Sequence, residues 1–107
     1  QDCELTLTPD LFADDALIWA DLASRNLTYH GAPGGLRLEI DFPDTPSLGD
    51  WQKPGANYIC IEPWQGLADA ADFAGDFHDK RGVIDLPPGE VHRLRMDVTV
   101  VPEEGNA

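Results

Sequence analysis

Short runs in which apolar and polar residues alternate constrain the fold of this chain more than any other feature. The clearest run covers residues 36–42, where apolar and charged side chains take turns: Leu36, Leu38, Ile40 and Phe42 against Arg37, Glu39 and Asp41. Successive side chains of a β-strand point to opposite faces, so this pattern predicts a strand with one buried and one solvated face. Residues 92–100 repeat the pattern, with Leu94, Met96, Val98 and Val100 on one side.

Weaker signals predict further strands at residues 4–8, 26–30, 58–62 and 83–86, separated by residues typical of turns. Residues 11–23 carry the only helix-like pattern, from which we expect a helical turn or a short helix. Loops are predicted at residues 43–49 and 65–82, where Pro, Gly and Asp accumulate. About six strands with short turns predict an all-β fold, an antiparallel β-sandwich, in a single segment spanning residues 1–107.

The length and charge of the chain limit its partners. It has 107 residues and a formal net charge of −13. A chain of this length is expected to bury roughly 65% of its unfolded surface, which is enough for one modest core. The excess of acid argues against binding to nucleic acid, which takes clustered Lys and Arg, and against adsorption to anionic membranes. No apolar run reaches the roughly 18–20 residues of a membrane span.

The cysteines and the first residues bear on the compartment. Cys3 and Cys60 are too few for a disulfide framework, and we expect free thiols in a reducing compartment. The chain opens on Gln-Asp-Cys-Glu, without the basic and apolar stretches of a signal peptide. Together these observations predict a cytoplasmic protein.

The predicted strand at residues 58–62 carries the most informative carboxylate. By period two, Glu62 shares a face with Tyr58 and Cys60, where it is poorly placed for hydration. A desolvated glutamate can act as a general base near neutral pH. Trp64 follows two residues later, and a carboxylate beside an aromatic ring is a frequent way of holding a sugar. The alternative is a solvated Glu62, or one paired with Lys80 or Arg81.

A second aromatic residue, Trp51, lies in a segment punctuated by Gly and Pro. Loops carry many binding residues, so Trp51 is a candidate for lining a ligand site. The alternative is that its ring covers the edge of the core.

Residues 49–66, with the sequence GDWQKPGANYICIEPWQG, resemble the C-terminal signature of the aldose 1-epimerase (galactose mutarotase) family. The similarity is greatest to the bacterial branch with a Cys-Ile-Glu-Pro-Trp strand. Weaker agreement extends through residues 11–17, 77–82 and 86–90, so the resemblance covers most of the chain.

The resemblance implies a fold, a reaction and roles for four residues. The family fold is a large antiparallel β-sandwich, the galactose mutarotase-like supersandwich. The reaction interconverts the α and β anomers of an aldose, here a hexose, without a cofactor or a metal. Glu62 corresponds to the general base. Asp15, with Asp14 as the alternative, corresponds to an aspartate that binds sugar hydroxyls, and Trp51 and Trp64 are the expected aromatic contacts.

The resemblance also implies that this chain is the C-terminal part of a longer protein. In the family, the histidine that acts as the acid comes from the N-terminal portion, and none of His30, His78 and His92 lies in that motif. The expected partner is therefore the N-terminal portion of the same protein, or a second copy through self-association. If the acid histidine is absent, the alternative is a non-catalytic module that binds a carbohydrate or a sugar phosphate.

A third interpretation rests on the acidic loop. Oxygen-rich loops bind Ca²⁺, and Asp69, Asp72, Asp76 and Asp79 lie close together in the sequence. Their spacing does not match an EF-hand loop, so this interpretation is the weakest of the three.

Overall fold

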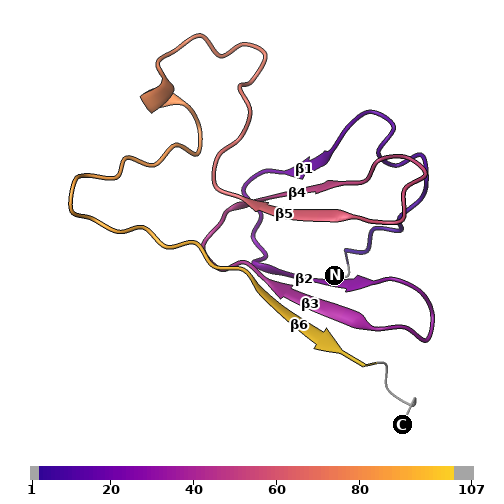
Figure 1. Ribbon diagram of the computed structural model, residues 1–107. Coiled ribbons are helices and arrows are strands. Elements are labelled where there is room, and N and C mark those ends of the chain that lie inside the picture. Colours follow the sequence, from indigo (N-terminus) through magenta and orange to yellow (C-terminus); the bar gives the residue numbers. More distant parts are fainter. Residues whose placement is uncertain (1–2, 103–107) are drawn as a thin grey trace.

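The computed structural model describes residues 3–102, which form two three-stranded antiparallel sheets (Figure 1). The strands are β1 (Leu17–Trp19), β2 (Asn26–His30), β3 (Arg37–Asp41), β4 (Ser47–Trp51), β5 (Cys60–Trp64) and β6 (Asp97–Val101). The helical content is one 3₁₀ turn, η1 (Phe77–Asp79). This architecture confirms the all-β, antiparallel sandwich-type fold class.

One sheet has the order β2-β3-β6 and separates apolar from polar side chains as the alternation predicted. In register, Leu27, Ile40 and Val98 lie side by side across the three strands. The opposite face is polar and includes Glu39 and Thr99. β2 and β3 lie where the sequence placed strands, with β3 one residue shorter at each end.

The second sheet has the order β1-β4-β5, so β4 is its central strand and β5 is an edge. β5 continues through Pro63 to Trp64, whereas the sequence predicted that Pro63 would end it. A proline has no N–H to donate, and an edge strand tolerates it because one of its sides pairs with no neighbour.

The core lies between the two sheets. Ile40, Phe42 and Leu48 form its buried centre, and five half-buried residues pack against them: Trp19, Leu22, Leu27, Leu38 and Ile61. Phe12, from the turns that precede β1, is also buried. Residues from both sheets therefore contribute to one small core.

Two predictions between residues 11 and 49 are corrected. Of the helical turn or short helix expected at residues 11–23, only turns form, over residues 9–14, and β1 follows with Ile18 exposed between half-buried Leu17 and Trp19. Instead of a loop, residues 47–51 form β4, which pairs with a strand on each side. The hydrogen bonds to these two neighbours outweigh the weak strand propensity of its Ser, Gly and Asp.

Other alternating segments lack a partner strand and are not strands. Residues 4–8 and 83–86 are irregular, and of residues 92–100 only those from Asp97 onward pair with β3. The loop predicted at residues 65–82 is confirmed, and it extends to residue 96 with η1 within it. Gln65 closes its base by donating from Nε2 to the carbonyl of Gly82 at 3.1 Å.

The molecule is more open than its length predicted. In Figure 1 the segment between β5 and β6 leaves the sheets as a long excursion. The Cα radius of gyration is 16.8 Å, against about 13 Å for a compact domain of this length. The accessible surface is 8206 Å², against roughly 5,900 Å² for a folded monomer of this mass. The fold therefore buries roughly half of the unfolded surface, less than the expected 65%.

Candidate functional site

The candidate site is the face of the β1-β4-β5 sheet that points away from the core, called here the outer face. Its side chains follow from the strand register, because Leu48 and Ile61 point inward and their neighbours point outward. The outer face carries Ile18, Ser47, Gly49, Trp51, Cys60, Glu62 and Trp64. It therefore brings together three of the four predicted site residues, Glu62, Trp51 and Trp64.

Glu62 is half-buried on β5, directly across from Gly49 on β4. The indole Nε1–H of Trp64 points to Glu62 Oε1 at 3.4 Å, which is long for a hydrogen bond. The ring of Trp64 lies over Gly49, where an added Cβ would come within 2.7 Å of the Trp64 Cζ2 atom. A glycine at position 49 thus leaves the space in which Trp64 reaches the carboxylate.

Trp51 lies at the other end of the outer face, across from Cys60. Its ring is half-buried and contacts that of Tyr58, with the ring centroids 6.1 Å apart and the planes tilted by 55°. This end of the outer face is therefore aromatic, and Glu62 lies between it and Trp64 along the sheet.

Asp15 lies outside the strands, two residues before β1 begins. The register of β1 with β4 carries it toward the Trp51 end of the sheet. It is exposed, has a φ of 88°, and its Oδ1 accepts the N–H of Ala16 at 2.8 Å. The carboxylate thus stabilises its own turn, and its second oxygen is open to further hydrogen bonds.

The cations that could have neutralised Glu62 pair with other acids. Lys80 Nζ lies 2.7 Å from Asp69, and Arg81 pairs with Asp21. The first pair holds the base of the long loop, and the second connects that loop to the turn after β1. The interpretation of Glu62 as the partner of Lys80 or Arg81 is therefore wrong.

Asp50 is a buried acid that the sequence did not single out. It points inward from β4, between Leu17 of β1 and Ile61 of β5, and is 9% exposed. Its Oδ1 has no hydrogen-bond partner. Burial, and secondly the negative charge of Glu62, raise its pKa to about 6. An aspartate between Gly49 and Trp51 is typical of a loop, so no pattern in the sequence could have revealed the burial of Asp50.

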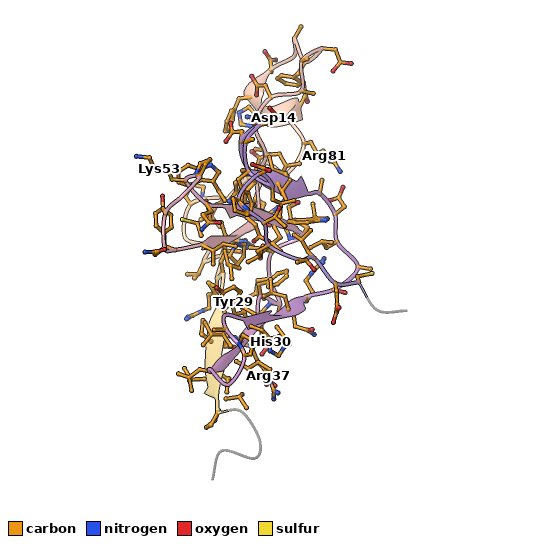
Figure 2. The ribbon with its side chains drawn as sticks, turned by 90° about the vertical axis from the view of Figure 1, so that its right-hand side faces the viewer. Asp14, Tyr29, His30, Arg37, Lys53 and Arg81 are labelled. Atoms are coloured by element: carbon orange, nitrogen blue, oxygen red, sulfur yellow. The ribbon has the colours of Figure 1, made fainter. Side chains whose placement is uncertain are left out.

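The histidines of the chain lie away from the outer face. His30 belongs to β2, on the polar face of the other sheet, and Figure 2 shows it beside Arg37 there. His78 is exposed in the long loop, where its Nδ1 lies 2.8 Å from Asp85. His92 is exposed in the segment that precedes β6.

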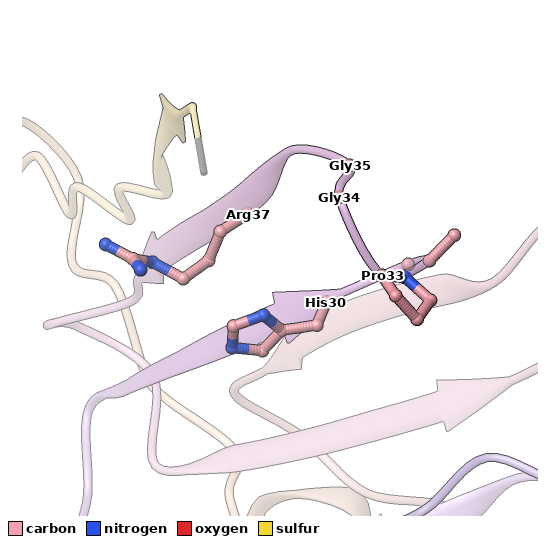
Figure 3. Close-up of a pocket in the computed structure, with 7 residues that line it drawn as sticks. His30, Pro33, Gly34, Gly35 and Arg37 are labelled. Carbon is pink, nitrogen blue, oxygen red and sulfur yellow. The ribbon is translucent and has the colours of Figure 1, made fainter. Parts of the chain in front are cut away.

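Two hollows on the described surface are lined by other residues. One, of about 560 Å³, lies at the β2–β3 hairpin between His30, the Gly-rich turn and Arg37 (Figure 3). Arg37 already pairs with Glu39 at 3.4 Å. The other, of about 160 Å³, lies between Thr45, Pro63 and the segment before β6. Neither of these two hollows is lined by a residue of the outer face.

The acidic loop does not assemble a metal site within residues 3–102. No group of three or more His, Cys, Asp or Glu side chains converges in this part of the chain. Asp69 is instead the partner of Lys80. The structure therefore gives no support to the calcium interpretation.

Both cysteines are free thiols, Cys3 exposed and Cys60 half-buried.

The chain is similar to two LacX proteins of Lactococcus lactis subsp. lactis. One is plasmid-encoded and the other chromosomal, and each is 31% identical over 98 residues, which cover 91% of this chain. The chain spans about a third of the length of these curated relatives. No family model matches the chain, and no solved structure matches it. Across residues 3–102, none of the helical structure is long and apolar enough to span a bilayer.

Proposed function

We propose that the outer face forms part of the sugar site of an aldose 1-epimerase-like isomerase, with Glu62 as its general base. The observation that carries this proposal is the placement of Glu62 on one face with Trp51 and Trp64. A carboxylate accepts hydrogen bonds from sugar hydroxyls, and indole rings pack against the C–H faces of a pyranose. The resemblance of residues 49–66 to the family signature supports the same assignment.

In the proposed reaction Glu62 removes the proton of the anomeric hydroxyl of a hexose. An acid on the far side of the sugar protonates the ring oxygen, and the C1–O5 bond breaks to give the open-chain aldehyde. Rotation about C1–C2 and closure on the other face of the carbonyl return both protons and yield the opposite anomer. Trp51 and Trp64 would position the ring, and Asp15 would bind a hydroxyl.

The acid must come from outside this chain in such a mechanism. His30 lies on the other sheet, and His78 and His92 lie in the excursion between β5 and β6. The proposal therefore concerns a protein of LacX length, in which this chain supplies the base and the aromatic surface.

The test is anomer exchange of glucose and galactose, followed by polarimetry, in a LacX-length protein that contains this chain. Glu62→Gln keeps the shape of the side chain and removes the base, so we expect the rate to fall by about 10²–10⁴. Glu90→Gln, an exposed glutamate of the long loop, is the matched control and should leave the rate unchanged. An unchanged rate in Glu62→Gln would refute the base assignment.

A second candidate function is carbohydrate binding without catalysis, favoured by the absence of a histidine from the described outer face. In that case the same LacX-length protein would bind a hexose, or a sugar phosphate, and quench tryptophan fluorescence without speeding anomer exchange. Trp51→Phe would reduce the fluorescence quenching. Glu62→Gln would weaken sugar binding, and there would be no catalysed anomer exchange for it to slow.

A further inference from the structure

The apolar face of the β2-β3-β6 sheet is covered over β3 and uncovered over β6. Val98 lies directly across from Ile40 on the same face, yet Ile40 is 3% exposed and Val98 is 52% exposed. The core layer therefore ends over β3. Four apolar residues at alternate positions of β6 and of the segment leading into it are exposed and are called here the β6 stripe: Leu94, Met96, Val98 and Val100.

Within residues 3–102, no strand pairs with the second edge of β6, which leaves its hydrogen-bonding groups open there. The two sheets have four edge strands, and the β6 edge is the one best suited to accept another strand. β1 has only three residues, and β5 contains Pro63. β2 has five residues, but its inward side chains Leu27 and Tyr29 are already half-buried. β6 has five residues, no proline and an uncovered apolar face, a combination that folded proteins usually protect.

We propose that the β6 stripe is a docking surface for a strand-bearing segment from the part of a LacX-length protein that these 107 residues do not include. The matched relatives are about three times as long as the stretch they share with this chain, so such a segment has a defined source. The accessible surface exceeds that of a compact monomer by roughly 2,300 Å², while a standard interface takes about 800 Å² from each partner. The excess is therefore large enough for extensive contact with the remainder of such a protein.

Charge argues against a second copy as the occupant. Each copy carries a net charge of −13, and bringing two copies together would concentrate that charge. The proposal is independent of the chemistry assigned to Glu62, since that residue lies on the outer face of the other sheet.

The experiment co-expresses the tagged 107-residue chain with the L. lactis LacX polypeptide from which the 98 matched residues have been removed. We expect a soluble 1:1 complex by size-exclusion chromatography with light scattering. Hydrogen exchange of the β6 amides should slow by about tenfold or more relative to the chain alone, because the open edge becomes paired.

Two variants of β6 distinguish docking through the β6 stripe from contact of the LacX polypeptide with other parts of the chain. The double variant Val98→Lys, Val100→Lys charges the stripe, and we expect the affinity to fall by about tenfold or more. Both side chains are more than half exposed in the free chain, so circular dichroism of that chain should not change. Thr99→Lys lies between them on the polar face, opposite Glu39, and should bind like the unaltered chain.

Three results would overturn the proposal. The first is that the 107-residue chain is recovered without the LacX polypeptide. This includes an insoluble LacX polypeptide, because docking on the β6 stripe should keep both polypeptides in solution. The second is a complex that the double lysine variant does not weaken. The third is a stable homodimer of the 107-residue chain that the double variant dissociates, which would assign the stripe to a second copy.

Discussion

Asp50 is the residue whose environment departs furthest from what its chemistry favours. It is buried between Leu17 and Ile61, and its pKa is raised from 3.8 to about 6. The folded state therefore holds the proton more tightly than the unfolded state. The contribution of Asp50 to the stability of the fold is therefore greatest below about pH 4, and it is lost as the pH rises through about 6.

Asp50→Asn should remove this pH-dependent penalty. We expect the variant to be more stable than the parent by about 2–3 kcal/mol at pH 8, and nearly equal to it at pH 4. Urea unfolding at several pH values measures the difference. Asp41→Asn, an exposed acid of β3, is the matched control. A variant whose advantage is the same at pH 4 and pH 8 would show that ionisation of Asp50 is not the cause.

Gly49 is the second residue with a sharp prediction, because the ring of Trp64 occupies the space above it. Gly49→Ala puts a Cβ within 2.7 Å of that ring, which must move away from Glu62. We expect a loss of about 1–3 kcal/mol in unfolding free energy and a changed near-ultraviolet circular dichroism spectrum. Gly66→Ala is the control, since nothing lies within 4 Å of its added Cβ. Equal effects at both positions would argue against the contact with Trp64.

At the scale of elements, the alternation of polarity identified β3, which has one wet face, and missed β4, which is buried on both faces, as well as the three-residue β1. β3 alternates because its polar face meets water, and the pattern identified it almost to the residue. The first four residues of β4 are all buried, so polarity does not alternate along it with exposure. The same limit hid Asp50, whereas period two correctly placed Glu62 on one face with Cys60.

Alternation predicts a strand only where a neighbour is available to pair with it. Residues 92–100 alternate throughout, but β3 has five residues and pairs with five. Residues 92–96 continue the alternation but form no hydrogen-bonded pairs with β3. The pattern therefore showed which side chains share one face, and it did not show how far the strand pairing extends.

The excursion between β5 and β6 should be the first element to open. Its ion pairs, Lys80 with Asp69 and His78 with Asp85, lie at the surface, where such pairs contribute about 0–1 kcal/mol. We expect brief trypsin treatment to cut first after Arg81 and Arg93, because both are exposed in a segment without strand pairing. Mass spectrometry of the earliest fragments identifies the sites.

Arg37 provides the internal comparison for this digestion. It lies in β3 and is paired with strands on both sides, so cutting there requires the sheet to open. The double variant Lys80→Gln, Arg81→Gln removes both adjacent trypsin sites, so one early fragment should disappear while the others remain. Cleavage after Arg37 before any cut in the excursion would contradict the predicted order of local stability.

At the scale of the whole molecule, the open shape fits the proposal that further structure covers part of this surface in a protein of LacX length. A chain that buries roughly half of its unfolded surface has fewer favourable contacts than its length allows. A protein about three times as long could cover the β6 stripe and build walls above the outer face with the same additional segments. Under the docking proposal above, such additional segments would also enlarge the small core.

The isolated chain should therefore remain extended in solution. We expect small-angle X-ray scattering to give a radius of gyration near the 16.8 Å of the structure, and not the roughly 13 Å of a compact domain. Replacing residues 67–81 with a short Gly-Ser linker tests the source of the extension, because the loop ends already meet at Gln65 and Gly82. The radius should then decrease while the two sheets persist by circular dichroism. A radius near 13 Å in the unaltered chain would mean that the excursion folds back onto the sheets, and the β6 stripe would then be covered from within.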